Sequence, residues 1–380
     1  MSGKVALIYS REFAAYSFGP YHPLRPERQI LTYELIKELG LLDNSNVSVL
    51  KPQIAKNEEL KLFHTQEYIE RVKKLCERGY GFLDYGDTPA VKGVFEASAL
   101  RVGATITASE CVAKEEFAHA FNFSGGLHHA RSSSAAGFCV FNDIVVAAKY
   151  LKKKLDVKKI VIVDVDAHHA DGTQDAFYSD PTVLTISLHE DGRYLYPGTG
   201  FIEEYGSELG IGYCVNVPLP PGTFDEAYLY AFNAIVPPLI EFFEPDIIIQ
   251  QFGVDTHYTD PLTHFALTTK VYEKIAKKMH ELAHKYSNGK LVVVGGGGYN
   301  PEATARSWTI AFATFLGSKL PEKTPESWRK LCKETYGIEP SEYLYDTKPP
   351  ELIEAEKKIV FEKVKKIIEE VRKTIWPLLF

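Results

Sequence analysis

The chain has 380 residues, of which 45% are hydrophobic and 24% charged, and its formal net charge is −7. This composition is typical of a globular protein with a large core. The sequence contains no low-complexity tract of the kind that indicates disorder. The acidic balance argues against a dedicated nucleic-acid-binding protein, which normally carries a basic surface. No stretch approaches the roughly 18 apolar residues of a membrane span, and the N-terminus lacks the pattern of a signal peptide. We therefore expect a cytoplasmic protein that does not act on membranes.

Apolar runs rich in β-branched residues alternate along the chain with segments of helical periodicity. This alternation predicts the α/β class, with a single open, mainly parallel β-sheet and helices on both faces. Because no linker rich in proline, glycine or serine divides the chain, we expect one domain over residues 1–380. The tail predicts a C-terminal helix at about 350–376 that packs on this domain. The predicted strands lie at 5–10, 48–55, 182–189 and 213–222 and within 119–144, 159–177, 244–265 and 289–301, and the main helices lie at 27–41, 63–77, 93–114, 225–243 and 269–287.

Potential metal ligands follow two of the predicted strands. In an open parallel sheet, ligands bind beyond the carboxyl ends of the strands. The period of two along a strand places Asp166 and His168 on one side, and Asp255 follows another apolar strand. Two carboxylates and one imidazole leave a position open for water, which is typical of a catalytic Zn²⁺ site. Fe²⁺ and Co²⁺ also fit, because mixed oxygen and nitrogen sites discriminate poorly between these ions.

Two further motifs indicate hydrolytic chemistry. His128 and His129 follow a pair of glycines, and on such a loop both rings can point into one cleft. Histidine can accept a proton from water and donate one to a leaving amine near neutral pH, while Asp164 and Asp171 could orient the two rings. Tyr299 follows four glycines and could polarise a carbonyl, with simple packing as the alternative.

These motifs resemble those of the histone deacetylase-like metal amidohydrolases, a family with an arginase-like α/β fold. The similarity is strongest to the prokaryotic acetoin-utilisation deacetylases, since the chain is short and lacks a eukaryote-like tail. The matching stretches occur in family order and span most of the chain: HPLRPER (22–28), SGGLHHARSSSAAGFCVFND (124–143), VDVDAHHADGTQDAF (163–177), SLH (187–189), YPGTG (196–200), FGVDTHYTDPLTH (252–264) and GGGGYNP (295–301).

The resemblance implies a role for each matching position. Zinc is expected on Asp166, His168 and Asp255. His129, paired with Asp171, is expected to be the general base and acid, and His128, paired with Asp164, a protonated electrostatic group. Tyr299 is expected to polarise the acetyl carbonyl. The resemblance also implies a structural K⁺ ion behind the zinc, held mainly by backbone oxygens of five residues: Asp164, Asp166, His168, Ser187 and Leu188.

The resemblance further implies a substrate channel. Gly137 and Phe138 match its wall, Asp87 matches an acid at its rim, and Arg28 matches an arginine near the exit path of acetate. Tyr196 stands where the eukaryotic enzymes usually have phenylalanine. Leu262 stands where the polyamine-preferring branch has glutamate, which favours an acyl-lysine or an uncharged acyl-amide substrate.

We therefore predict a zinc-dependent hydrolase that deacetylates acetyl-lysine in proteins. One alternative is a deacetylase of small acetylated amines such as polyamines, and another is a non-catalytic acyl-lysine binder. An arginase-like ureohydrolase would need a two-manganese cluster with more acidic ligands. The expected partner is an acylated protein or small acyl-amine, without direct nucleic-acid contact, and an oligomer is compatible with the sequence.

Overall fold

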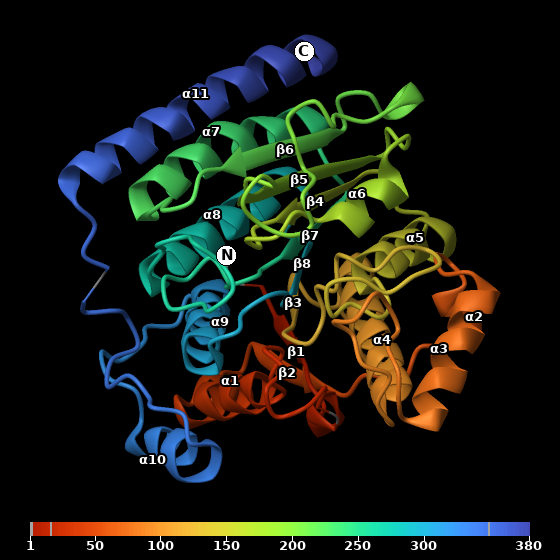
Figure 1. Ribbon diagram of the computed structural model, residues 1–380, viewed down its shortest axis with the longest axis vertical. Helices are drawn as coiled ribbons and strands as arrows, with labels where there is room; N and C mark the ends of the chain where they lie inside the picture. Colours follow the sequence, from red (N-terminus) through yellow and green to blue (C-terminus); the bar gives the residue numbers. More distant parts are fainter. Residues whose placement is uncertain (1–2, 16, 349) are drawn as a thin grey trace.

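An eight-stranded sheet runs through the part of the chain that this computed structural model describes, residues 3–15, 17–348 and 350–380 (Figure 1). Every neighbouring pair of these strands is parallel, and their order is β2-β1-β3-β8-β7-β4-β5-β6. The predicted open, parallel sheet is confirmed. The strands are β1 (Val5–Ile8), β2 (Val47–Leu50), β3 (His119–Asn122), β4 (Ile160–Asp164), β5 (Val183–Glu190), β6 (Cys214–Leu219), β7 (Ile247–Gln251) and β8 (Leu291–Val294).

Helices cover both faces of the sheet, as predicted (Figure 1). One face carries α1 (Glu27–Glu38), α7 (Asp225–Phe243), α8 (Thr269–Tyr286) and α9 (Pro301–Phe315), and α11 (Glu354–Leu379) lies beside α7. The other face carries α4 (Val94–Ala113), α5 (Asp143–Leu155) and α6 (Asp171–Phe177), with α2 (Asn57–Leu60) and α3 (Gln66–Arg78) outside them. The short helix α10 (Glu326–Lys330) contacts α1.

Side chains alternate between the two faces along each strand. In β4, Val161 and Val163 join the core under α7, α8 and α9, whereas Ile160 and Ile162 join the core under α4 and α5. Burial on both sides explains why the strands read as continuous β-branched runs. Each fully buried aliphatic side chain contributes about 1.5–3 kcal/mol by leaving water. We propose that the chain forms one domain, because the first of these cores extends from β1 to α11.

The observed element boundaries differ from several predictions, and three of the differences have a clear local cause. The second strand ends at Leu50 rather than residue 55, since Pro52 cannot donate to a ladder. The helix predicted at 63–77 begins at Gln66, where the Thr65 hydroxyl caps it. The C-terminal helix covers 354–379 rather than 350–376, because Ile353 is extended before it and the helix continues through Pro377.

The C-terminal helix packs on the sheet domain. Its buried residues Val364, Ile368, Val371 and Ile375 belong to the same core cluster as α7. These residues are spaced by three or four, so they lie on one face of the helix. Among the described residues, no helix combines the length and apolarity that crossing a membrane requires.

Candidate active site

Four neighbouring strands end at the same level of the sheet. Residue pairs across the ladder align the last residues of β3, β8, β7 and β4: Asn122 with Val294, Val294 with Gln251, and Gln251 with Asp164. The loops that follow these strands therefore begin side by side. They carry the histidine pair, the four glycines and the two acidic motifs that the sequence singled out.

Three potential metal ligands meet beyond the carboxyl ends of these strands. Asp166 and His168 follow β4, Asp255 follows β7, and their ligand atoms all lie within 4.8 Å of one another. His168 Nδ1 lies 3.1 Å from Asp166 Oδ1 and 2.7 Å from Asp255 Oδ2. All three side chains are buried. The structure thus brings together the three residues that were predicted to hold a metal ion.

The second oxygen of each carboxylate is fixed by protein N–H groups. Asp166 Oδ2 accepts hydrogen bonds from Gln251 Nε2 at 2.6 Å and from the Gly297 amide at 2.7 Å. Asp255 Oδ1 accepts one from the Ala167 amide at 2.8 Å. The remaining oxygens both face His168, which is the orientation that a shared metal ion requires. Gln251, the last residue of β7, was not among the predicted site residues.

The electrostatics of the triad suit a divalent cation. Burial and the neighbouring charge of Asp166 raise the pKa of Asp255 well above its usual range. Burial also acts to raise the pKa of Asp166, but the positive charges of His128 and His168 outweigh it and hold this pKa well below its usual range. Two adjacent buried carboxylates need a positive charge between them. A metal ion bound to both would supply it.

The tandem histidines are each paired with a carboxylate. His128 Nδ1 lies 2.9 Å from Asp164 Oδ2, and His129 Nδ1 lies 2.7 Å from Asp171 Oδ1. Both rings are buried, and their Nε2 atoms are 3.1 Å apart. The predicted pairing of each histidine with its own aspartate is therefore present in the structure, and both free ring nitrogens point to the same place.

The two histidines have opposite pKa shifts. For His128, burial lowers the pKa, but the charges of Asp164 and Asp166 prevail and raise it to about 9. For His129, burial and the neighbouring charge of His128 lower the pKa to about 4, despite the hydrogen bond to Asp171. These shifts favour the charged form of His128 and the neutral form of His129. Environments that separate the pKa values of two adjacent groups are typical of an acid and base pair.

Polar residues outside the predicted set fix the histidine loop. Asp143, at the start of α5, accepts hydrogen bonds from the Gly126 and Leu127 amides. Asn142 caps α5 and donates its amide hydrogens to the His128 and Ala130 carbonyls. The Asn-Asp pair before an apolar helical run was a sequence signal for a helix cap, but nothing in it indicated that the cap also holds the loop of the two histidines.

Tyr299 lies beside the metal triad. Its ring centroid is 6.2 Å from that of His168 and 5.8 Å from that of Phe138. Its amide donates to Asp260 Oδ2 at 2.7 Å. Arg28 lies behind the glycine run that delivers Tyr299: it is buried, and its Nη1 donates to the Gly298 carbonyl at 3.1 Å.

Three of the five predicted channel residues line an open cleft of about 620 Å³. Asp87, Gly137, Tyr196 and Asp171 line it, together with Arg131. A Cβ atom built on Gly137 would lie 2.5 Å from His129 Cδ2 and 3.0 Å from Tyr196 Cε1, which places this glycine between the two rings.

Two predicted wall residues, Phe138 and Leu262, are not part of the lining of this cleft. Phe138 contacts Tyr299 and also His22, with 4.5 Å between the His22 and Phe138 ring centroids. His22 Nε2 in turn lies 3.0 Å from the Asp87 carbonyl, so it connects the wall to the rim. Leu262 is half-buried on the loop after β7, where its amide donates to Asp260.

The rim of the cleft is acidic. Burial and the neighbouring Asp84 raise the pKa of Asp87 to about 6. Asp84 accepts hydrogen bonds from the amides of Gly86, Asp87 and Thr88. The two carboxylates therefore share one turn at the entrance, and they could accept either backbone N–H groups or an ammonium group of a substrate.

His169 received no role from the sequence, and the structure gives it one in support of the cleft. Its Nδ1 lies 2.8 Å from Thr199 Oγ1, and its Nε2 lies 3.1 Å from Gln174 Oε1. Thr199 belongs to the loop that carries Tyr196. His169 thus connects α6 to the loop that forms one wall.

The chain is similar to known proteins over most of its length. The sequence profile of the histone deacetylase domain matches residues 22–315. The acetoin utilization protein AcuC of Bacillus subtilis (strain 168) is 43% identical over 337 residues, which cover 86% of each chain. The protein of the same name from Staphylococcus aureus (strain MSSA476) is 36% identical over 376 residues, 94% of this chain and 96% of that one. A crystal structure of a histone deacetylase homologue complexed with SAHA superposes with a TM-score of 0.82 at 34% identity, covering 95% of this chain and 100% of that one.

Proposed function

Because the chain belongs to the histone deacetylase family, and is therefore a hydrolase of acetyl amides, we propose that it removes acetyl groups from protein lysine side chains with zinc. One observation carries the proposal. A buried triad of potential metal ligands lies next to two histidines, each paired with its own carboxylate, and one of these carboxylates, Asp171, lines the neighbouring cleft.

We propose that Asp166, His168 and Asp255 hold the metal ion. Two buried carboxylates and one imidazole match a divalent cation in charge and in donor type. When bound, zinc would polarise the acetyl carbonyl and lower the pKa of a water molecule. Fe²⁺ and Co²⁺ accept the same donor set.

The remaining residues divide the proton transfers between them. His129 accepts a proton from the attacking water and later donates it to the leaving lysine amine, while Asp171 keeps its ring oriented. Asp164 holds His128 in its charged form. The positive charge of His128 stabilises the negative charge that develops on the oxygen atoms bonded to the acetyl carbonyl carbon. The Tyr299 hydroxyl donates a hydrogen bond to the acetyl oxygen as that oxygen gains charge.

The cleft provides the substrate contacts. We propose that Gly137, Phe138, Tyr196 and Leu262 enclose the lysine side chain and that Asp87 accepts hydrogen bonds from the substrate backbone at the rim. Arg28 would meet the released acetate near the glycine run. The acidic rim would also attract a polyamine, but Leu262 supplies no carboxylate at the position where the polyamine-preferring branch has glutamate.

The test is a direct comparison of substrates with the zinc-loaded chain. We expect kcat/KM for an acetyl-lysine peptide to exceed that for N-acetylputrescine by about 10-fold or more. As a catalytic control, Tyr299→Phe should lower peptide turnover by about 10²-fold, because only the hydroxyl donor is lost. A preference for N-acetylputrescine would favour the polyamine alternative. Peptide binding without any turnover in the zinc-loaded protein would favour the non-catalytic binder.

We also propose a structural K⁺ ion behind the triad, on backbone oxygens of Asp164, Asp166, His168, Ser187 and Leu188. Asp164 and Ser187 are partners in the β4–β5 ladder. The Tyr228 hydroxyl reaches the Val165 and Leu188 carbonyls at 3.3 Å and 3.5 Å, so carbonyl oxygens gather at this point.

An ion that binds only the folded chain raises its thermal midpoint. We therefore expect a midpoint several degrees higher in potassium chloride than in sodium chloride of the same ionic strength, measured by circular dichroism. The matched ionic strength controls for general screening by salt. Equal midpoints in the two salts would argue against the K⁺ site.

A further inference from the structure

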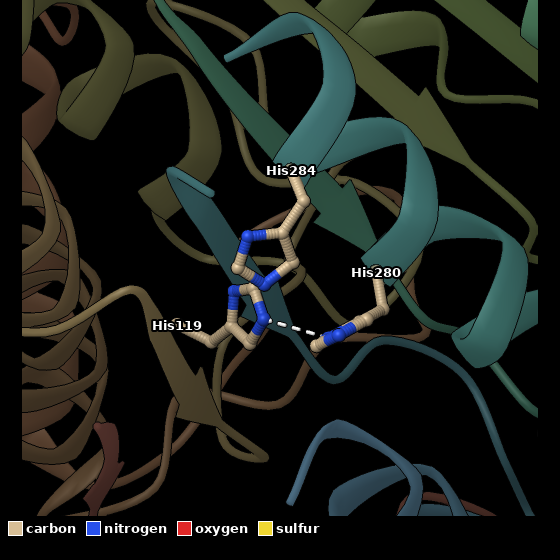
Figure 2. A group of neighbouring side chains, drawn as sticks. All are labelled: His119, His280 and His284. Carbon is tan, nitrogen blue, oxygen red and sulfur yellow. Dashed lines mark hydrogen bonds between the residues drawn. The ribbon is translucent and has the colours of Figure 1, made fainter. Parts of the chain in front are cut away.

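A second cluster of potential metal ligands lies at the opposite end of the strands, where β3 begins. His119 is the first residue of β3, and His280 and His284 lie one turn apart on α8 (Figure 2). The candidate active site follows the carboxyl ends of the strands, whereas His119 begins its strand. Because all strands are parallel, the two clusters lie at different ends of the sheet.

The three rings converge. Their ligand atoms all lie within 4.8 Å of one another, and His119 Nε2 is 2.8 Å from His280 Nδ1. Ring centroids are 4.9 Å apart for His119 and His280, 5.2 Å for His119 and His284, and 4.5 Å for His280 and His284. A spacing of four residues places the two α8 histidines on one face of the helix, and Figure 2 shows both turned toward His119.

The cluster contains a buried ring nitrogen without a partner. His119 is only 1% exposed, and its ring lies near the backbone of Ala118 and Gly289. The Nε2 atom of His284 is buried and has no hydrogen-bond partner within the described ranges. A buried, unpaired nitrogen loses its contacts with water and gains nothing in return. Coordination of a metal ion is one way to compensate this loss.

The surroundings of all three imidazoles favour the neutral form, which is the form that binds metal. Burial and the two neighbouring histidines lower the pKa of His119 to about 3. Burial and then His284 lower the pKa of His280, and burial lowers that of His284.

The backbone around α8 is shaped to admit the rings. Gly289, in the turn after α8, has φ +82°, and a Cβ atom there would lie 3.0 Å from both Cε1 and Nδ1 of His284. A side chain at this position would press on the His284 ring. The nearest element beyond the turn is β8, whose first residue pairs with His119 in the ladder. The site therefore lies between the first residue of β3 and one face of α8.

We propose that His119, His280 and His284 bind a divalent transition-metal ion that connects β3 to α8, separately from the catalytic centre. Three neutral imidazoles suit Zn²⁺, Cu²⁺ or Ni²⁺, whereas Mg²⁺ and Ca²⁺ require oxygen ligands. His280 and His284 are half-buried, so water can complete the coordination. The opposite end of β3 leads into the loop of His128 and His129, so this ion would anchor the strand that positions them.

Zn²⁺ stoichiometry distinguishes the two sites. The full chain is stripped of metal, titrated with Zn²⁺ against a chromophoric chelator, and its bound zinc is counted. We expect two equivalents for the wild type, one for Asp255→Asn, one for His284→Gln and none for the double variant. The His284→Gln protein should keep its deacetylase activity and lose the zinc-dependent rise in thermal midpoint that Asp255→Asn retains.

Any other pattern overturns the proposal. One equivalent in the wild type that disappears in Asp255→Asn would leave only the catalytic site. Two equivalents in a folded His284→Gln protein would place the second ion elsewhere. If His284→Gln fails to fold, Cu²⁺ added to Asp255→Asn still decides the question by electron paramagnetic resonance. Coupling to several imidazole nitrogens supports the cluster, and coupling to one or none refutes it.

Discussion

Asp255→Asn is expected to lower kcat for an acetyl-lysine peptide by about 10³-fold or more, and to remove the catalytic zinc ion. Asparagine keeps the size of the side chain and the oxygen that accepts the Ala167 amide hydrogen bond. It replaces the anionic oxygen that lies 2.7 Å from His168 Nδ1 with an NH₂ group, which cannot ligate a metal ion. The substitution therefore removes one ligand and one negative charge while the backbone stays in place.

A matched control separates this loss from a general effect of removing a carboxylate. Asp225 lies at the start of α7, where it accepts hydrogen bonds from the amide and hydroxyl of Thr268. Asp225→Asn should leave both kcat and zinc content within about twofold of the wild type, because its charge faces no other candidate ligand. Atomic spectroscopy of the dialysed proteins measures the zinc, and initial rates measure kcat. An Asp255→Asn protein with near-normal turnover would contradict the assignment of Asp255 as a ligand.

The sheet was predictable from the sequence because its signals are local. Each β-branched run is short, buried on both faces and followed by turn residues, so strand type and parallel arrangement follow from alternation with helices. The same rule predicts that Asp166 and Asp255 lie beyond the carboxyl ends of neighbouring strands. It could not give the strand order, and only the ladder shows that β7 lies between β4 and β8.

Residues whose partners are distant in sequence were not predictable in this way. Gln251 reads as the polar end of a buried strand, and its hydrogen bond to Asp166 spans 85 residues. His119 and His280 are 161 residues apart. His280 and His284 have the H-E-x-x-H spacing of two metal ligands on one helix face, but this spacing does not indicate that His119 lies beside them. Their meeting depends on β3 lying beside β8, next to the end of α8. The role of His169 likewise depends on the position of the loop that contains Thr199.

The division of labour between the tandem histidines leads to a second large expected effect. His129 is neutral beside Asp171, and His128 is held charged by Asp164, so only His129 is ready to accept a proton. We expect His129→Ala to lower kcat by about 10²–10⁴-fold, the usual contribution of a general acid and base. Zinc content should remain near that of the wild type, because His129 is not among the three candidate ligands.

A change of leaving group tests which proton transfer His129 serves. In an ester analogue of acetyl-lysine, oxygen replaces the side-chain nitrogen, and the departing alcohol depends less on protonation than an amine does. If His129 donates the proton to the leaving amine, His129→Ala should be impaired several-fold less on the ester than on the amide. His128→Ala should be impaired equally on both, since a charged group that stabilises developing negative charge acts before the leaving group departs.

Equal losses on ester and amide for His129→Ala would restrict His129 to the activation of water and transfer the acid role to another residue. A selective rescue of His128→Ala by the ester would identify that residue as His128.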